Sequence, residues 1–279
     1  MSTLNGAREF DPYSRRHRKE LDDVIDIRLR SQWFENYEIN KHLIKKWGDI
    51  THVPIIEKAI IVGAGWSLDW NIHLLEGCKT PVISTDKSLK RVMKYVKPFA
   101  VCALNTGETD IAEWLDIGET DIWLIAPVTA HPDTFKNWKG PMAFVNPQNT
   151  CPDLVSLVQA ETGIIPTMRG CNAGYFSLIT AFTLNAKMTA MLGMNYCYKT
   201  EKEALSATCD DHCVKMRDIN GKFVFTALDW LDARREMLNF CLDIADEMRV
   251  VNCSEGGIIY EQGVIDAMTF DLWRQYDGP

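Results

Sequence analysis

The chain has 279 residues, a net charge of −8 at neutral pH and 46% hydrophobic residues, a composition typical of a globular protein with a large core. The acidic balance argues against nucleic acid as a partner, because phosphate neutralisation needs a basic surface. No apolar run reaches the roughly 20 residues that span a bilayer, and the polar start predicts no secretory signal, so we expect a cytoplasmic protein that contacts no membrane.

Residues 1–50 are expected to form a helical N-terminal extension. A basic run at 15–19 is followed by apolar residues at helical spacing, and then by Trp33 and Phe34. This pattern predicts one or two amphipathic helices that pack on the main domain or on a second copy of the chain, so we expect that the protein can form a homo-oligomer. The basic run itself is interpreted as a solvated helix face.

Residues 51–279 are expected to form one Rossmann-like domain. Short runs rich in β-branched residues alternate with helix-length segments such as 68–77 and 87–96, a pattern typical of βαβ units. We therefore predict an α/β fold, with a mainly parallel sheet between two helical layers (α/β/α), preceded by the helical extension. The predicted strands of the first half are 59–62, 81–84, 99–104, 122–126 and 142–145.

The second half continues this pattern less regularly. The polar segment 199–215 is interpreted as a loop or lid, and Asn220-Gly221 as a hairpin turn before a short strand. The sequence further predicts a buried helix over 173–186, a strand over 188–194, a long helix over 228–248 and a last strand over 249–252.

The nine cysteines are an odd number and are scattered along the chain, which favours free thiols in a reducing compartment. Most lie among apolar residues and are expected to pack as small hydrophobic side chains. The segment 209–213 differs, because it places Cys209, His212 and Cys213 close together with two aspartates.

The clearest candidate for ligand binding is the turn Gly63-Ala64-Gly65 with Ser67, which follows a predicted strand and opens a helix. Glycines let the backbone approach a phosphate, whose charge is met by amide groups and the helix dipole. Ser67 could bind the same phosphate or cap the helix. Asp86 ends the next strand, where a carboxylate often binds ribose hydroxyls. The turn lacks the third glycine of a dinucleotide fingerprint and the lysine of a Walker loop, so a tight turn without a ligand stays an alternative.

Three further clusters follow predicted strands or open a predicted helix, at the edge where α/β sheets bind ligands. Small residues at a helix start permit either close approach to a ligand or helix–sheet packing. A tyrosine can stack on a base and form a hydrogen bond through its hydroxyl. The clusters are Asn172 with Gly174, Asn195 with Tyr196, and Ser254 with Glu255.

Taken together and in this order, the segments resemble the 6-hydroxymethylpterin diphosphokinase MptE-like family. The resemblance covers roughly residues 55–265. The family is similar to the central domain of flagellin-modifying motility accessory factors and to bacterial sialyltransferases, which use CMP-activated sugars on a Rossmann-like sheet. The shared motifs are Gly-x-Gly-x-Ser-Leu, Thr-Asp-Lys-Ser-Leu-Lys, Gly-x-Asn-x-Gly, Leu-Gly-Met-x-Tyr and Asn-x-Ser-Glu-Gly-Gly.

The resemblance implies a transferase that binds a nucleotide and a small-molecule acceptor. In one reaction, a pterin hydroxymethyl group attacks the β-phosphorus of ATP and yields the pterin diphosphate and AMP, while Mg²⁺ neutralises the phosphates. The related sugar transferases imply instead that a hydroxyl acceptor displaces CMP from a CMP-sugar, which requires a general base. A nucleotide-binding or assembly module that has lost catalysis is the third alternative.

At two positions where the family usually carries acidic residues, this chain has Asn105 and Asn195. An amide keeps the hydrogen-bonding shape but loses the charge that binds magnesium well. The implied catalytic residues are His212 and Glu255. His212 would act as the base, at a place where related sugar transferases have a histidine, and Glu255 could assist a metal. For His212, an exposed loop histidine and a zinc site with Cys209 and Cys213 are the alternatives. The implied nucleotide-binding residues are Gly63, Gly65, Ser67, Asp86, Asn105, Asn172, Gly174, Asn195, Tyr196 and Ser254.

Overall fold

The computed structural model contains a nine-stranded sheet in the described part of the chain, and every strand pairing in it is parallel. The strand order is β11-β10-β7-β1-β2-β3-β4-β5-β6. The structure describes residues 11–105, 107, 111–148, 150–168, 170–207 and 213–275. The strands are β1 (Lys58–Val62), β2 (Val82–Thr85), β3 (Ala100–Cys102), β4 (Trp123–Pro127), β5 (Met142–Pro147), β6 (Pro166–Thr167), β7 (Met188–Leu192), β10 (Arg249–Asn252) and β11 (Asp266–Ala267).

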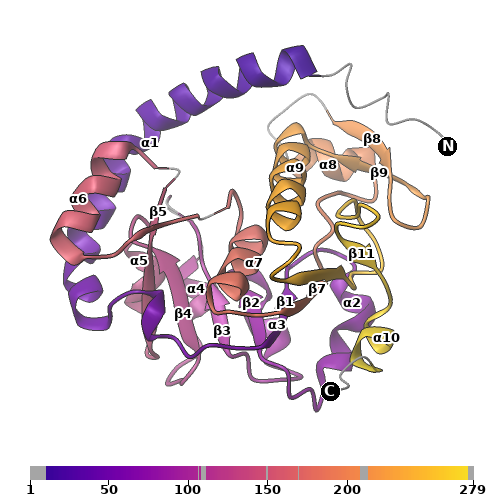
Figure 1. The fold of residues 1–279 in the computed structure, drawn as a ribbon, viewed down its shortest axis with the longest axis horizontal. Coiled ribbons are helices and arrows are strands. Elements are labelled where there is room, and N and C mark those ends of the chain that lie inside the picture. The colour runs from indigo at the N-terminus through magenta and orange to yellow at the C-terminus, as the bar shows by residue number, and fades with distance from the viewer. Residues whose placement is uncertain are drawn as a thin grey trace.

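Two layers of helices cover this sheet, so the predicted three-layer α/β/α arrangement is confirmed. One face carries α7 and α9, and the other carries α1 to α6 and α10 (Figure 1). The α-helices are α1 (Asp11–Trp47), α2 (Leu68–Asn71), α3 (Leu89–Val92), α4 (Ile111–Leu115), α5 (Asp133–Lys136), α6 (Pro152–Thr162), α7 (Ala173–Thr183), α8 (Glu201–Ala207), α9 (Leu228–Asp243) and α10 (Phe270–Gln275), and short 3₁₀ turns are η1 (Ile50–His52), η2 (Ile72–Leu75) and η3 (Asp86–Ser88).

The strands alternate their side chains between the two layers, although both faces are buried. Ile61 of β1 joins the core beneath α7 and α9, whereas Ile60 and Val62 join the core beneath α2, α3 and α10. A strand that is buried on both faces needs a continuous apolar run. This requirement explains why the runs around 59–62 and 122–126 are readable from the sequence.

The predicted N-terminal extension is one long helix, α1, over the described residues. Its last four turns pack on the domain, where Trp33, Tyr37 and Ile44 are buried. The Tyr37 hydroxyl donates to the Glu161 carboxylate of α6 at 2.8 Å, and Figure 1 shows α1 and α6 side by side. The amide of Asn40 donates to the Ala130 carbonyl oxygen at 2.8 Å, beyond the end of β4. The helix therefore completes the outer layer over β4 and β5.

Several elements differ from the predictions. The segments after β1 and β2 are not single helices but short helical turns, α2 with η2 and η3 with α3. The segment interpreted as a loop or lid contains α8 and the start of a two-stranded antiparallel hairpin, β8 (Val214–Arg217) with β9 (Phe223–Thr226). The predicted Asn220-Gly221 turn is confirmed, with Gly221 at φ +75°. Among the described helices, none has the length and apolar character to cross a bilayer.

Candidate functional site

A cavity of about 530 Å³ opens at the carboxyl ends of the central strands. Here the chain leaves β1 in one direction toward β2 and later returns to its other side as β7. Such a point, where the strand order reverses, is where open α/β sheets bind ligands. The cavity is lined by residues 63–65, 85–87, 104–105, 171–174 and 193–197, together with Trp114 and Trp230. Most of the predicted site segments therefore meet in one place.

The glycine turn after β1 lines this cavity, but its N–H groups are largely engaged within the protein. Gly63 N–H donates to the Leu192 carbonyl oxygen and Gly65 N–H to the Gly193 carbonyl oxygen, each at 2.8 Å. A Cβ on Gly63 would lie 2.7 Å from the Gly193 oxygen, so the glycines are needed for close packing of the segments after β1 and β7. Phosphate binding by Gly63, Gly65 and Ser67 stays a prediction.

Asn195 fastens the same turn from the side of β7. Its Oδ1 accepts from both the N–H and the hydroxyl of Ser67, at 3.1 Å each. Ser67 is fully buried and does not line the cavity, and it makes no side-chain cap to α2. A Cβ on Gly65 would lie 2.2 Å from Asn195 Oδ1. In this structure, the Asn195 oxygen is used to hold the turn.

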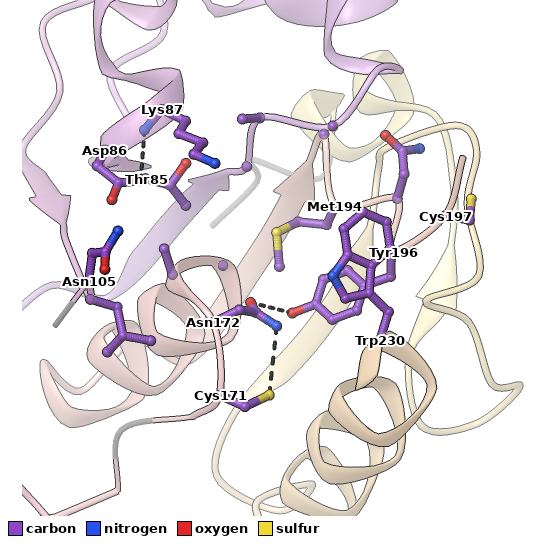
Figure 2. A pocket seen from close by; sticks show the side chains of 18 of the residues that line it. Thr85, Asp86, Lys87, Asn105, Cys171, Asn172, Met194, Tyr196, Cys197 and Trp230 are labelled. Atoms are coloured by element: carbon purple, nitrogen blue, oxygen red, sulfur yellow. Dashed lines mark hydrogen bonds between the residues drawn. The ribbon is translucent and has the colours of Figure 1, made fainter. Parts of the chain in front are cut away.

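A carboxyl group and an amine line the cavity at the end of β2. Asp86 is buried, and its Oδ1 accepts the Lys87 N–H at 2.7 Å. Burial raises the pKa of Asp86 above its ordinary value, although the hydrogen bond from Lys87 and its charge oppose this rise. Asn105, after β3, lies across from Asp86 (Figure 2), and its Oδ1 accepts the Gly107 N–H at 2.9 Å.

The start of α7 forms the floor of the cavity near β7. Asn172 caps the helix, because its Oδ1 accepts the Tyr175 N–H at 3.0 Å, and it also accepts the Tyr196 hydroxyl at 2.7 Å (Figure 2). Burial raises the pKa of Tyr196 well above its ordinary value, so this hydroxyl stays neutral and donates. Ala173 and Gly174 line the cavity at the first helical positions, whose N–H groups have no partner within a helix.

Other predicted site residues lie elsewhere. Ser254 is fully buried, where its hydroxyl accepts the Met194 N–H at 2.9 Å and supports the wall from behind. Glu255 does not line the cavity, and its Oε1 accepts the Phe270 N–H at 3.5 Å. His212 and Cys209 lie outside the described residues, so the catalytic and zinc interpretations of that segment stay predictions. Trp66, in the turn before Ser67, does not line the cavity, and its Nε1–H donates to the Cys197 carbonyl oxygen at 3.1 Å.

Among the lining residues that the sequence did not predict are one charged and two aromatic side chains, those of Lys87, Trp114 and Trp230. Lys87 directly follows Asp86, and its Nζ lies 4.9 Å from the centroid of the Trp114 ring. Trp230, in the first turn of α9, stacks on Tyr198 with ring centroids 4.7 Å apart. Figure 2 shows Asp86 and Lys87 on one side of the cavity and Trp230 on the opposite side. Lys87 could have been predicted because it directly follows Asp86 at the end of β2, but no local sequence pattern indicates that Trp114 and Trp230 line the cavity.

Among the described residues, the donor groups of the cavity do not form a resident magnesium site. Asp86 is the one carboxylate among the described lining residues, and the Asn195 oxygen is engaged by Ser67. No cluster of three His, Cys, Asp or Glu side chains occurs among the residues that the structure describes. Magnesium is often held by one or two carboxylates together with substrate phosphates, so Mg²⁺ fits this cavity only as part of a nucleotide complex.

Comparison with solved structures shows a shared fold with the MAf glycosyltransferase from Magnetospirillum magneticum AMB-1. The TM-score is 0.65 at 15% sequence identity, and the alignment covers 86% of this chain and 40% of that chain. This chain thus spans less than half the length of that enzyme.

Comparison by sequence is consistent with this fold. No protein with curated annotation matches the chain. The 6-hydroxymethylpterin diphosphokinase MptE-like family matches residues 31–201, from within α1 to the start of α8. Because this match extends over more than half of the chain, the protein belongs to the 6-hydroxymethylpterin diphosphokinase MptE-like family.

Proposed function

We propose that the protein is a nucleotide-dependent transferase whose nucleotide binds in the cavity between the ends of β1, β2, β3 and β7. The observation that supports this most directly is the position of the cavity at the reversal of strand order, with the start of α7 as its floor. Helix starts attract phosphate because their free N–H groups and dipole favour negative charge.

The proposed contacts follow from the chemistry of the lining. The N–H groups of Ala173 and Gly174 face a phosphate, and the Asp86 carboxylate accepts hydrogen bonds from ribose hydroxyls. The amides of Asn105 and Asn172 recognise polar edges of the base or acceptor. Trp230 offers an apolar ring face for a planar group. The volume of about 530 Å³ is within the usual range of small-molecule sites.

The family relationship supports diphosphate transfer as the reaction. The hydroxyl oxygen of the pterin alcohol bonds to the β-phosphorus of ATP, and the bond from that phosphorus to the bridging oxygen of the α-phosphate breaks. AMP leaves with this oxygen, and the hydroxyl proton passes to a base, for which His212 stays the proposed residue. The chain binds and orients the two substrates, and Mg²⁺ bound to ATP would supply the charge that neutralises the phosphates.

A second candidate is transfer of a sugar from a CMP-sugar. One observation favours it: the described lining carries a single carboxylate, the lower limit of the one or two that usually hold Mg²⁺ together with substrate phosphates. The shared fold with a glycosyltransferase agrees with this alternative. The acceptor hydroxyl would displace CMP, and its proton would again pass to the base.

The deciding test consists of two experiments on the purified full chain. In the first, the chain is incubated with 6-hydroxymethyl-7,8-dihydropterin, ATP and Mg²⁺, and AMP formation is followed by chromatography. In the second, binding of CMP and of ATP is measured by calorimetry, each with Mg²⁺ and with EDTA. Reactions without the pterin serve as controls for ATP hydrolysis.

Each outcome supports one of the three alternatives for the function, or none of them. AMP that forms only when pterin, ATP and chain are together supports diphosphate transfer. Binding of CMP without binding of ATP favours sugar transfer. Binding of ATP without AMP formation indicates a module that has lost catalysis, and the absence of binding to both nucleotides overturns the proposed function.

A further inference from the structure

The cavity contains a single positively charged side chain among its described lining residues, that of Lys87. The chain as a whole is acidic, with a net charge of −8. An anionic ligand that enters the cavity therefore needs a local source of positive charge, since the overall field does not attract it. Lys87 is the side chain placed to supply that charge.

The turn that carries Lys87 is fixed to the centre of the sheet. The Ser88 hydroxyl donates to the Val62 carbonyl oxygen at the end of β1, at 2.7 Å, and it accepts the Thr85 N–H at 3.1 Å. The Lys87 N–H is held by Asp86 Oδ1. These bonds tie the end of β2 to the end of β1, so the Lys87 side chain starts from a rigid position beside the glycine turn.

Among the described residues, the ammonium group of Lys87 contacts an aromatic ring and no carboxylate. Its Nζ lies 4.9 Å from the centroid of the Trp114 ring, a cation–π contact that leaves the charge intact. In the described part of the chain, no carboxylate lies within ion-pair distance of Lys87. Figure 2 shows its side chain extended into the cavity.

The glycine turn cannot take over this role with its named donors. The Gly63 N–H donates to the carbonyl oxygen of Leu192, the last residue of β7, and the Gly65 N–H donates to that of Gly193. The Ser67 N–H donates to Asn195 Oδ1. A phosphate beside this turn therefore receives no hydrogen bond from these three N–H groups, and Lys87 is the cationic side chain that the described lining offers it in addition to the N–H groups at the start of α7.

We propose that Lys87 binds a phosphate of the nucleotide, with Trp114 holding its ammonium group in place, and that this contact makes the site select nucleotides over nucleosides. The inference rests on the proposed function, because it assumes that the cavity binds a nucleotide. It applies equally to AMP and CMP, since both carry the same phosphate group.

The test compares Lys87→Met with Lys90→Met as a matched control. Both substitutions remove one lysine charge, but Lys90 is exposed on α3 and does not line the cavity. Binding of AMP, CMP, adenosine and cytidine is measured by calorimetry in EDTA, so that no divalent cation replaces the amine. Thermal unfolding verifies that both variants fold.

For the nucleotide that the wild-type chain binds, we expect Lys87→Met to weaken affinity by about 10- to 100-fold, the range of a charged hydrogen bond. Affinity for the matching nucleoside should stay unchanged, and Lys90→Met should bind as the wild type does. Lys87→Arg should retain most of the affinity, because the charge is kept.

Two other results have separate meanings. If the wild-type chain binds a nucleotide and Lys87→Met binds it equally well, the role of Lys87 is overturned while the proposed function stands. If Lys87→Met weakens nucleoside and nucleotide alike, the lysine shapes the cavity and does not bind phosphate, which also overturns the inference. If the wild-type chain binds neither AMP nor CMP here and neither ATP nor CMP with Mg²⁺, the proposed function itself fails.

Discussion

At the scale of single residues, Asp86 combines burial with a titratable group. Its carboxyl is 7% exposed, and burial raises its pKa above the ordinary value of 3.8. Because the folded state then holds the proton more tightly than the unfolded state, stability falls as the pH rises from the ordinary value through the raised one. A ligand hydroxyl that donates to this carboxylate would offset part of that cost.

We therefore expect Asp86→Asn to raise the melting temperature of the ligand-free chain at pH 7. The amide keeps the oxygen that accepts the Lys87 N–H and removes the buried charge. The difference from the wild type should shrink as the pH falls toward the ordinary value of 3.8, because the raised pKa lets the folded carboxyl take up its proton before the unfolded one does. Thermal unfolding between pH 4 and pH 8 measures it.

Asp121→Asn is the matched control for this experiment. Asp121 is exposed at the start of the β4 segment, and the hydrogen bond from Lys97 lowers its pKa, so its substitution should act in the opposite direction and weakly. If Asp86→Asn melts at a lower temperature than the wild type at pH 7, the buried carboxylate of Asp86 does not destabilise the folded chain, which contradicts the prediction.

The site also shows what the sequence can and cannot predict at this scale. Residues at the ends of parallel strands were expected to meet, and the structure brings Asp86, Asn105, Asn172 and Asn195 to one cavity. Which of their atoms are free depends on partners far along the chain. The N–H groups of Gly63 and Gly65 donate to carbonyl oxygens of Leu192 and Gly193, at the end of β7, and no pattern within residues 63–67 contains that information.

At the scale of elements, α1 is attached by its C-terminal half. Ile44 is 2% exposed in the core beneath α6, whereas Ile39 of the same helix is 55% exposed. We expect Ile44→Ala to lower the free energy of unfolding by about 2–5 kcal/mol, the range for removing a buried aliphatic side chain. Urea denaturation followed by circular dichroism measures the change.

Ile39→Ala removes the same atoms from the same helix and controls for helix propensity. It should change the free energy of unfolding by less than about 0.5 kcal/mol, as surface substitutions do. Equal effects of the two substitutions would show that α1 does not pack on the domain as described.

The helices and strands also differ in how well they can be predicted from the sequence. The central strands β1, β2, β4 and β5 were predictable, because burial on both faces demands a continuous apolar run. The early ends of helices α2 and α3 were not predictable, since a four-residue helix and a longer helix share the same local sequence pattern. The same holds for α8 and β8, whose polar residues form structure by packing on the neighbouring hairpin strand β9.

At the scale of the whole molecule, the proposed ligand joins segments from both halves of the domain. Binding at about 100 times the dissociation constant stabilises a folded chain by about 2.7 kcal/mol. For a domain of this size we expect the melting temperature to rise by about 5–10 °C. Differential scanning fluorimetry with AMP, CMP and their nucleosides measures the shift.

Hydrogen exchange then locates the effect. Protection should increase in segments 63–65, 85–87, 171–174 and 193–197, which line the cavity, while the β8–β9 hairpin serves as the internal control. A thermal shift without protection of these segments would place the ligand elsewhere on the molecule.

The position of β7 has a consequence for how the chain is made. β7 lies between β1 and β10, and Ala59 pairs with Thr189, so one edge of β1 stays unpaired until the ribosome has delivered residues 188–192. An open edge of a parallel sheet can pair with strands of other chains, and pairings between distant segments form late. The yield of folded protein therefore depends on the timing of synthesis as well as on final stability.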